Sequence, residues 1–336
     1  MEILVYKIHE LFGGVGAPRK ALINLGVNHK AIDYVEIEEK AVRAYNALYD
    51  NRYKPQSVVG YNLMADIMVH GSPCQDFSRS GTRLGGNDED KTRSSLMFET
   101  LKIIENLGIW KPKCVVWENV KGVMDKDMIH SFKKYLSRMK KLGYTNSYEV
   151  LSAMDFGIPQ RRNRVFVVSY LGTKVFDFKK LELKPFRHIS EFLEPNVNES
   201  QYKINVPSML NRIEEFNPSA KTKYRTLDVI EDSCWTISTR QDRCPNAGII
   251  KTDEGHYRYL TERECWRLMG FDDEDFENVL REYPSKKGKR NAGLYKLAGN
   301  SIVVPVLEAI FKVIIEDGLV SEKVTGSFKE VQSKGA

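Results

Sequence analysis

Residues 6–18 read YKIHELFGGVGAP, and this stretch decides how the chain begins to fold. Tyr6–Phe12 is rich in apolar and aromatic side chains and predicts a buried strand. Gly13-Gly14-Val15-Gly16 follows as a tight turn, because glycine lets the backbone bend sharply and lets a ligand approach it closely. Pro18 suits the first turn of a helix, and Gly26 suits its end. The stretch therefore predicts a strand, a turn and a helix, the first unit of an α/β sheet.

The same alternation continues through the first half of the chain. Further strands are predicted at Asp33–Ile37, Met64–Val69, Cys114–Trp117 and Arg164–Leu171. Helical periodicity covers Leu96–Leu107 and Ile129–Leu142, each followed by a glycine. Short strands that alternate with helices favour an α/β fold with crossover helices.

Near residue 175 the pattern changes and indicates a second domain. From there to about residue 284 the apolar runs shorten, and Pro, Asn and Ser interrupt them. At the end, Asn300-Ser301 is placed to cap an apolar helix over Ile302–Glu316, which needs a core to pack on. We expect a large domain at 1–180 completed by 292–320, a small domain at 184–285, and a polar tail at 321–336.

Composition is typical of a globular protein without a membrane anchor. Of 336 residues, 42% are hydrophobic and 29% charged, which is ample for a core. We expect no apolar run near the roughly 20 residues of a membrane span, no signal peptide, and a cytoplasmic location. The five cysteines form no zinc spacing, so we expect free thiols and no metal. The net charge of +6 permits a polyanionic partner without proving one.

The glycine-rich turn is a candidate ligand site. Glu36, at the end of the next predicted strand, stands where an acidic side chain can bind both hydroxyls of a ribose. The turn by itself is equally consistent with a plain tight turn. A nicotinamide dehydrogenase is the other ligand-binding alternative, although the spacing falls short of the full dinucleotide motif.

Two reactive side chains follow predicted strands. Cys74 stands in GSPCQDFS at 71–78, and Glu118 follows the strand that ends at Trp117. A nucleophilic sulfur and a carboxylate at the carboxyl ends of strands are the parts needed to attack a ring and hold its protonated form. Taken singly, such a thiol is more often structural, such a carboxylate is more often solvated, and the run QRRNR at 160–164 is more often a charged surface.

Together, these motifs resemble the DNA (cytosine-5) methyltransferase family. The order is Pro-Cys-Gln, Glu-Asn-Val and then Gln-Arg-Arg-Asn-Arg, and RSSLMFE at 93–99 and LTERECWRLMGF at 260–271 match further motifs of the family. The resemblance implies a Rossmann-like sheet of the adenosylmethionine-dependent methyltransferases, with helices on both faces. It also implies a smaller, irregular target-recognition domain.

The resemblance assigns roles at the reacting centre. Cys74 would add to carbon 6 of cytosine in a covalent intermediate, and carbon 5 would then accept the methyl group. Glu118 would bind the N3 edge of the ring. Arg162 and Arg164 match the arginine motif, and Arg164 would hold the pyrimidine oxygen or the catalytic loop.

The cofactor implied is S-adenosyl-L-methionine. Phe12 would stack near its adenine, and Gly14 and Gly16 would leave room for its methionine part. The full set implied is Phe12, Gly14, Gly16, Glu36, Ile37, Pro73, Leu96, Asn300 and Ser301. The chain departs from the family at Ala17, often a glycine, and at Gly60-Tyr61-Asn62-Leu63, where Gly-Asp-Ile is expected. The contact to the adenine amino group is therefore unassigned, with Asn62 as a candidate.

Double-stranded DNA is the implied partner, and a target cytosine must be swung out of the stack to react. The residues that the resemblance places on DNA are Gln75, Ser78, Arg79, Arg83, Thr236, Arg240, Gln241 and Arg243. The last three could read base edges, or could contact phosphate or only solvent. The basic run at 286–290 could grip phosphates or be solvated.

Three alternatives stay open. The first is a transfer-RNA cytosine-5 methyltransferase of the same family, whose usual Cys-Phe-Thr signature is missing here. The second is a catalytically silent DNA-binding relative, and the third is the nicotinamide oxidoreductase. We expect a prokaryotic or phage enzyme, monomeric, and either solitary or paired genetically with a restriction endonuclease.

Overall fold

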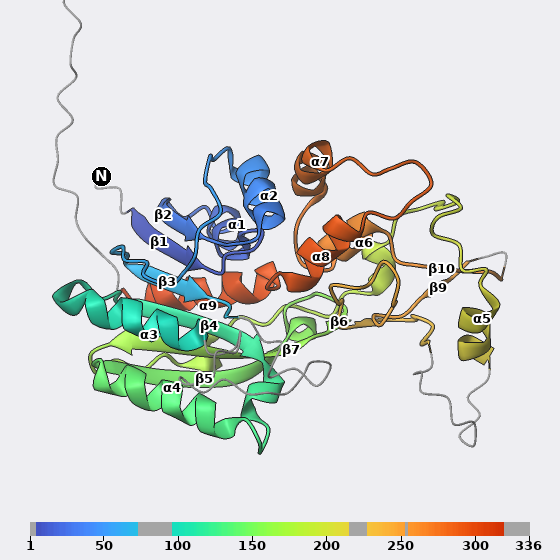
Figure 1. Ribbon diagram of the computed structural model, residues 1–336. Coiled ribbons are helices and arrows are strands. Elements are labelled where there is room, and N and C mark those ends of the chain that lie inside the picture. Colours follow the sequence, from blue (N-terminus) through green and yellow to red (C-terminus); the bar gives the residue numbers. More distant parts are fainter. Residues whose placement is uncertain (1–4, 73–95, 215–226, 253–254, 319–336) are drawn as a thin grey trace, which may run out of the picture.

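The computed structural model describes residues 5–72, 96–214, 227–252 and 255–318. Its centre is a six-stranded sheet in the order β2-β1-β3-β4-β7-β5 (Figure 1). Strands β1 to β4 are parallel, and β7 runs antiparallel between β4 and β5. The strands are β1 (Tyr6–Leu11), β2 (His29–Val35), β3 (Ile67–His70), β4 (Cys114–Val120), β5 (Tyr144–Ser152) and β7 (Asn163–Leu171).

Helices cover both faces of this sheet. Val115 and Trp117 of β4 join a hydrophobic cluster with α3 and α4, whereas Cys114 and Val116 join a second cluster with α1 and α9. Because successive side chains of a strand point to opposite faces, the two clusters lie on opposite sides of the sheet. The helices of this part are α1 (Ala17–Asn24), α2 (Glu39–Tyr49), α3 (Met97–Asn106), α4 (Ile129–Lys141), α8 (Ala292–Asn300) and α9 (Val304–Glu316).

The predicted α/β fold is confirmed, with differences at the ends of elements. Strand β2 covers His29–Val35 rather than Asp33–Ile37, because it pairs with β1 from its first residue to its last. Glu36 therefore lies just beyond the strand. Helix α2 and the half-exposed edge strand β5 have no counterpart in the prediction, although the apolar side chains of α2 gather on one buried face.

The closing helix α9 packs against α1, but its cap differs from the prediction. Asn300 is the last residue of α8, and Ser301 caps that helix at its carboxyl end. Helix α9 begins two residues later than predicted, with Pro305 in its first turn, where a missing N–H does no harm. Among the described residues, only Ala292–Glu316 is apolar and long enough to cross a membrane, which corrects our expectation of no such run. It is 61% buried inside the protein, as for a core helix.

The region from about residue 175 to 285 is less regular but not without helices. Ile204, Leu227, Ile249 and Tyr259 form a small hydrophobic cluster of their own. Helix α6 packs against α8, and α7 packs against α2 (Figure 1). The elements here are α5 (Pro207–Glu214), α6 (Glu262–Arg267), α7 (Asp273–Glu282), β8 (Cys234–Trp235), β9 (Ile250–Lys251) and β10 (Tyr257–Arg258). The short strand β6 (Gln160–Arg161) precedes this region in the sequence. Strand β6 pairs with β8, and β9 pairs with β10.

Candidate active site

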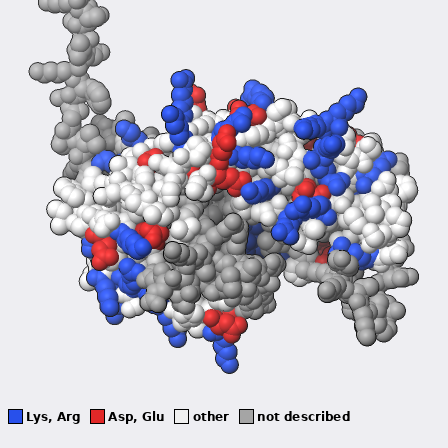
Figure 2. Space-filling view, in the orientation of Figure 1, with Lys and Arg blue, Asp and Glu red and all other residues white. Residues whose placement is uncertain are grey.

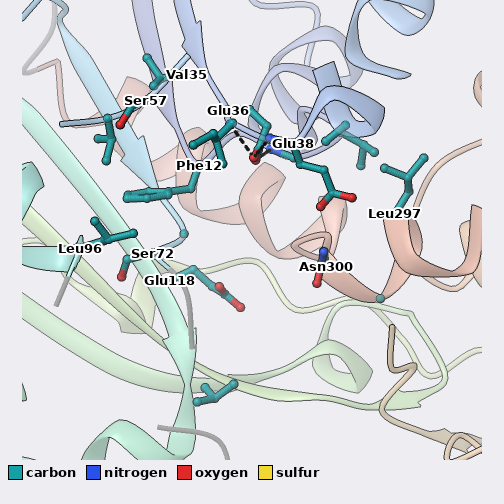
Figure 3. A pocket seen from close by; sticks show the side chains of 18 of the residues that line it. Phe12, Val35, Glu36, Glu38, Ser57, Ser72, Leu96, Glu118, Leu297 and Asn300 are labelled. Atoms are coloured by element: carbon teal, nitrogen blue, oxygen red, sulfur yellow. Dashed lines mark hydrogen bonds between the residues drawn. The ribbon is translucent and has the colours of Figure 1, made fainter. Parts of the chain in front are cut away.

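A cavity of about 520 Å³ opens at the carboxyl ends of the parallel strands (Figure 3). This edge of an open α/β sheet is where such folds bind ligands. One part of the wall is apolar, and another carries carboxylates and an amide. The apolar residues include Phe12, Val35, Val58 and Leu96, and the polar ones include Glu36, Glu38, Glu118 and Asn300.

The glycine-rich turn and Glu36 are joined to one another. Gly14 N–H donates to Glu36 Oε2 at 3.2 Å, while the N–H groups of Ile37 and Glu38 donate to Oε1 at 2.8 and 2.9 Å. Burial raises the pKa of the Glu36 carboxyl, and these three donors act in the opposite direction. The carboxylate is therefore fixed in orientation at the cavity wall.

The predicted cofactor residues divide into two groups. Phe12, Gly14, Glu36, Ile37, Leu96 and Asn300 line the cavity, and Ser301 lines a smaller one of about 40 Å³ beside it. Gly16 lines neither. A Cβ atom there would lie 2.5 Å from the ring of Tyr45, so this glycine is required by packing behind the turn. Pro73 lies outside the described residues.

Glu118 and Arg164 form an ion pair at the cavity. Glu118 Oε1 lies 3.1 Å from Arg164 Nε, and the two side chains are only 12% and 17% exposed. Burial raises the pKa of the Glu118 carboxyl, and the charges of Arg164 and Arg162 offset this only in part. A carboxyl group held in this way is easier to protonate than a solvated one.

Arg162 lies at the same cavity but makes contacts of a different kind. Its Nη1 donates to Ile237 O at 3.1 Å, and its Nη2 donates to the carbonyls of Gly299 and Ser301 at 3.1 and 2.8 Å. The guanidinium thus joins three distant parts of the chain. These contacts orient the Arg162 guanidinium at the cavity wall.

Ser72, two residues before Cys74, is held in place by Trp117 and Asn119, for which the sequence predicts no role of this kind. Trp117 Nε1 donates to Ser72 Oγ at 3.0 Å, and Asn119 Nδ2 donates to Ser72 O at 3.2 Å. All three side chains are buried. The Glu-Asn-Val motif could have drawn attention to Asn119, because this asparagine directly follows Glu118. Cys74 itself lies outside the described residues.

The adenine contact proposed for Asn62 is not found at the cavity. Gln56, Ser57 and Val58 line it instead. Gln56 is held in place by its own N–H, which donates to Glu36 O at 2.8 Å, and by its side-chain Nε2, which donates to Tyr34 O at 2.9 Å. Position in the sequence alone could not show that residues 56–58, and not Asn62, line the cavity.

The residues expected on DNA have different surroundings. Arg240 and Arg243 are exposed, and Thr236 Oγ1 donates to Arg161 O at 2.9 Å. Gln241 is fully buried, and its Oε1 accepts from Ala247 N–H at 3.2 Å. A side chain held inside the protein cannot reach a base edge from that position, so the expected contact of Gln241 is corrected.

The remaining DNA candidates, Gln75, Ser78, Arg79 and Arg83, lie outside the described residues. Lys and Arg side chains are prominent on the right-hand part of the face in Figure 2. Within the described ranges, no group of three His, Cys, Asp or Glu side chains is arranged to hold a metal ion.

Comparison with known proteins gives a consistent result. Residues 6–316 match the family described as C-5 cytosine-specific DNA methylase. The Type II methyltransferase M2.ScrFI of Lactococcus lactis subsp. cremoris is 30% identical, with 91% of this chain and 98% of that protein covered. The Type II methyltransferase M.Bsp6I of Bacillus sp. (strain RFL6) is 31% identical, with 90% and 96% covered.

Solved structures share the fold at lower identity. The S. pombe Dnmt2 methyltransferase has a TM-score of 0.72 at 21% identity, covering 93% of this chain and 99% of that one. The Entamoeba histolytica methyltransferase EhMeth has a TM-score of 0.74 at 20% identity, covering 93% and 98%. The sheet order, the cavity at its carboxyl edge and the match over residues 6–316 lead to one conclusion: the chain belongs to the family of C-5 cytosine-specific DNA methylases.

Proposed function

We propose that this protein transfers the methyl group of S-adenosyl-L-methionine to carbon 5 of a cytosine in duplex DNA. The observation that carries the proposal is the buried Glu118–Arg164 pair at the wall of a cavity large enough for the cofactor. Membership of the family supports DNA methylation and the use of a methyl donor. The identity of that donor and the role of each residue are the proposal.

The residues around the cavity fit adenosylmethionine. Its volume of about 520 Å³ is within the usual range for small-molecule sites. The apolar wall of Phe12, Val58 and Leu96 suits an adenine ring, and the oriented carboxylate of Glu36 suits the two ribose hydroxyls. Bound there, the cofactor would supply an electrophilic methyl group to carbon 5 of cytosine.

The adenine edge would be read by residues 56–58 in place of the missing acidic residue. Ser57 Oγ already accepts from Val59 N–H at 3.1 Å, which orients it beside the cavity (Figure 3). Its remaining lone pair can accept from an exocyclic amine. Ser57→Ala should weaken binding of S-adenosylhomocysteine, and unchanged affinity in calorimetry would contradict this assignment.

Side chains of the protein would then carry out the chemical steps on the cytosine ring. Cys74 would add its sulfur to carbon 6 of the cytosine, while the protonated Glu118 carboxyl donates to N3 and Arg164 orients that carboxyl. This addition makes carbon 5 nucleophilic enough to take a methyl group. Loss of the proton from carbon 5 to a base, departure of the Cys74 thiolate and return of the N3 proton to Glu118 would restore the aromatic ring.

Recognition of the DNA sequence would lie in residues 184–285. Arg240, Arg243 and Thr236 remain our candidates for contacts to the target, together with Gln75, Ser78, Arg79 and Arg83 after the nucleophile. Because α6 and α7 pack on the large domain, we propose that residues 184–260 carry the reading surface and that the two helices form its base. Swinging out the cytosine would cost a few kcal/mol.

The experiment that tests the proposal is methyl transfer from labelled adenosylmethionine to unmethylated genomic DNA, with total transfer RNA as a parallel substrate. Base analysis should place the label in 5-methylcytosine of DNA. Label in RNA alone would favour the transfer-RNA alternative, and no label from folded, cofactor-binding protein would favour the silent relative. Bisulfite sequencing would then map the target.

The biological setting is also a proposal. The relatives with the higher identities are named Type II methyltransferases, and a 24% identical one is named an orphan methyltransferase of Bacillus phage SPR. We therefore propose a cytoplasmic, monomeric enzyme that either accompanies a restriction endonuclease or acts alone.

A further inference from the structure

A cluster of tyrosines lies directly behind the glycine-rich turn. Tyr34 comes from β2, Tyr45 and Tyr49 come from α2, and Tyr53 follows that helix. The ring centroids of Tyr34 and Tyr45 are 3.8 Å apart, those of Tyr45 and Tyr49 are 4.7 Å apart, and those of Tyr34 and Tyr53 are 5.6 Å apart. We call these four residues the tyrosine cluster.

Two hydroxyls of the tyrosine cluster donate to carbonyls of the turn. Tyr34 OH donates to Gly14 O at 2.6 Å, and Tyr49 OH donates to Gly16 O at 2.7 Å. Hydrogen bonds of this length between side chain and backbone restrict the peptide groups that they hold. The turn is therefore fixed from behind at two of its four residues.

Packing against the tyrosine cluster explains why two of the three glycines in the turn cannot carry a side chain. A Cβ atom on Gly13 would lie 2.5 Å from the ring of Tyr34, and one on Gly16 would lie 2.5 Å from the ring of Tyr45. Gly14 has open space at that position and a φ of +55°. Gly13 and Gly16 thus allow contact with the tyrosine cluster, while Gly14 and Gly16, the latter with a φ of +75°, allow the bend of the backbone.

The peptide groups on either side of Gly14 are held from two directions. Its N–H donates to Glu36 Oε2 at the cavity, and its carbonyl accepts from Tyr34 OH behind the turn. Tyr34 and Glu36 are separated by one residue at the end of β2. The turn and the carboxylate proposed for the ribose are consequently linked as one unit.

We propose that Tyr34 and Tyr49 are positioning residues, whose hydroxyls set the conformation of the cofactor turn before the cofactor binds. This inference rests on the proposed function of the cavity as the adenosylmethionine site. A turn already held in its binding conformation loses less conformational freedom when a ligand binds, which raises affinity.

The test uses three variants that each remove one hydroxyl and keep the ring. Tyr34→Phe and Tyr49→Phe remove the bonds to the turn. Tyr53→Phe is the matched control, because its hydroxyl donates to Ala31 O at 3.3 Å, outside the turn. Binding of S-adenosylhomocysteine is measured by calorimetry, together with the KM for adenosylmethionine, kcat and unfolding in urea.

We expect Tyr34→Phe and Tyr49→Phe each to weaken binding about three- to tenfold, the size of one lost hydrogen bond. KM for the cofactor should rise by a similar factor while kcat at saturation stays near that of the wild type. Hydrogen exchange of the amides at 13–16 should become faster in these two variants without any ligand present. Tyr53→Phe should change none of these values.

Two results would overturn the inference. If both variants bind and exchange like the wild type, the hydroxyls do not set the turn. If Tyr53→Phe weakens binding equally, the effect belongs to general packing of the tyrosine cluster. Failure of the proposed function would differ, because the wild-type protein itself would then bind no S-adenosylhomocysteine, and this inference would fall with it.

Discussion

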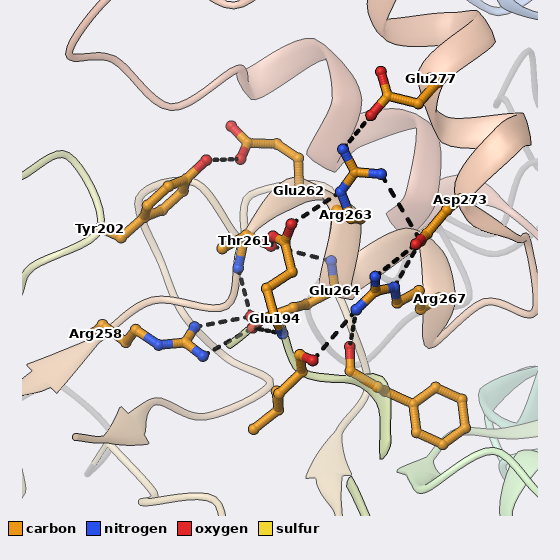
Figure 4. A network of polar contacts seen from close by, with 12 residues as sticks. Glu194, Tyr202, Arg258, Thr261, Glu262, Arg263, Glu264, Arg267, Asp273 and Glu277 are labelled. Carbon is orange, nitrogen blue, oxygen red and sulfur yellow. Dashed lines mark hydrogen bonds and ion pairs between the residues drawn. The ribbon is translucent and has the colours of Figure 1, made fainter. Parts of the chain in front are cut away.

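Replacing Arg258 by Met should strongly destabilise the junction between β10 and α6. Arg258 and Glu264 form a bidentate ion pair with distances of 2.9 and 2.8 Å (Figure 4). The side chains are 7% and 0% exposed. The Glu264 carboxylate also accepts from Thr261 N–H at 2.8 Å and from Glu194 N–H at 2.9 Å.

The magnitude follows from what the variant leaves behind. Arg258→Met fills the space but leaves the Glu264 carboxylate buried without its counter-charge. Removing one partner of a buried pair typically destabilises a protein by about 3–5 kcal/mol. Because two backbone N–H donors remain on the carboxylate, we expect about 3 kcal/mol at pH 8.

A second substitution in the same pair provides a check. Adding Glu264→Gln to the variant removes the charge and should recover at least about 1 kcal/mol, which a double-mutant cycle measures.

The assay is urea unfolding at pH 8, followed by fluorescence. Arg187→Met is the control, because its pair with Glu191 is about half exposed and should contribute less than about 1 kcal/mol. A loss below about 1 kcal/mol for Arg258→Met, or no recovery on adding Glu264→Gln, would show that this buried pair is not a significant source of stability.

Three further predictions concern the active site and its support. Cys74→Ser should abolish turnover and leave binding of S-adenosylhomocysteine and DNA largely intact, and appreciable turnover would exclude the covalent route. Glu118→Gln should lower kcat by about 10²–10⁴-fold in the methyl-transfer assay without unfolding the protein, and near-normal activity would contradict its role. Burial raises the pKa of Glu10 to about 7, so folding stability should fall by on the order of 3 kcal/mol as the pH rises from about 4.5 to 7 and then level off. Glu10→Gln should remove that part of the pH dependence in urea unfolding at pH 5 and 8, and an unchanged pH dependence would contradict it.

Local pattern was sufficient for five of the six strands of the central sheet, all except β5. The strand–turn–helix unit at residues 6–24 depends on neighbours in the chain, since apolar runs and glycines act where they stand. Glu118 was predicted to follow the strand that ends at Trp117, but β4 runs on to Val120 because it pairs with β7, so Glu118 lies inside the strand near its carboxyl end. The family resemblance then implied a chemical role for each of these positions.

Capping and strand ends were less predictable because they depend on pairing and packing. Asn300-Ser301 has the composition of a helix start, yet it ends α8, because the chain turns there between two buried helices. Strand β2 extends back to His29 because β1 offers it partners along its whole length. In both cases, contacts with other elements determine where the helix or strand begins or ends.

What the sequence by itself determined is the fold class and the family. Only the tertiary structure decided that Gly16 packs on Tyr45, that Gln241 is buried, and that Arg162 holds carbonyls at residues 237, 299 and 301. The physical reason is the distance along the sequence over which each kind of interaction acts. Propensity and periodicity act over a few residues, whereas these contacts join positions separated by up to 139 residues and form only once the sheet and its helices have packed.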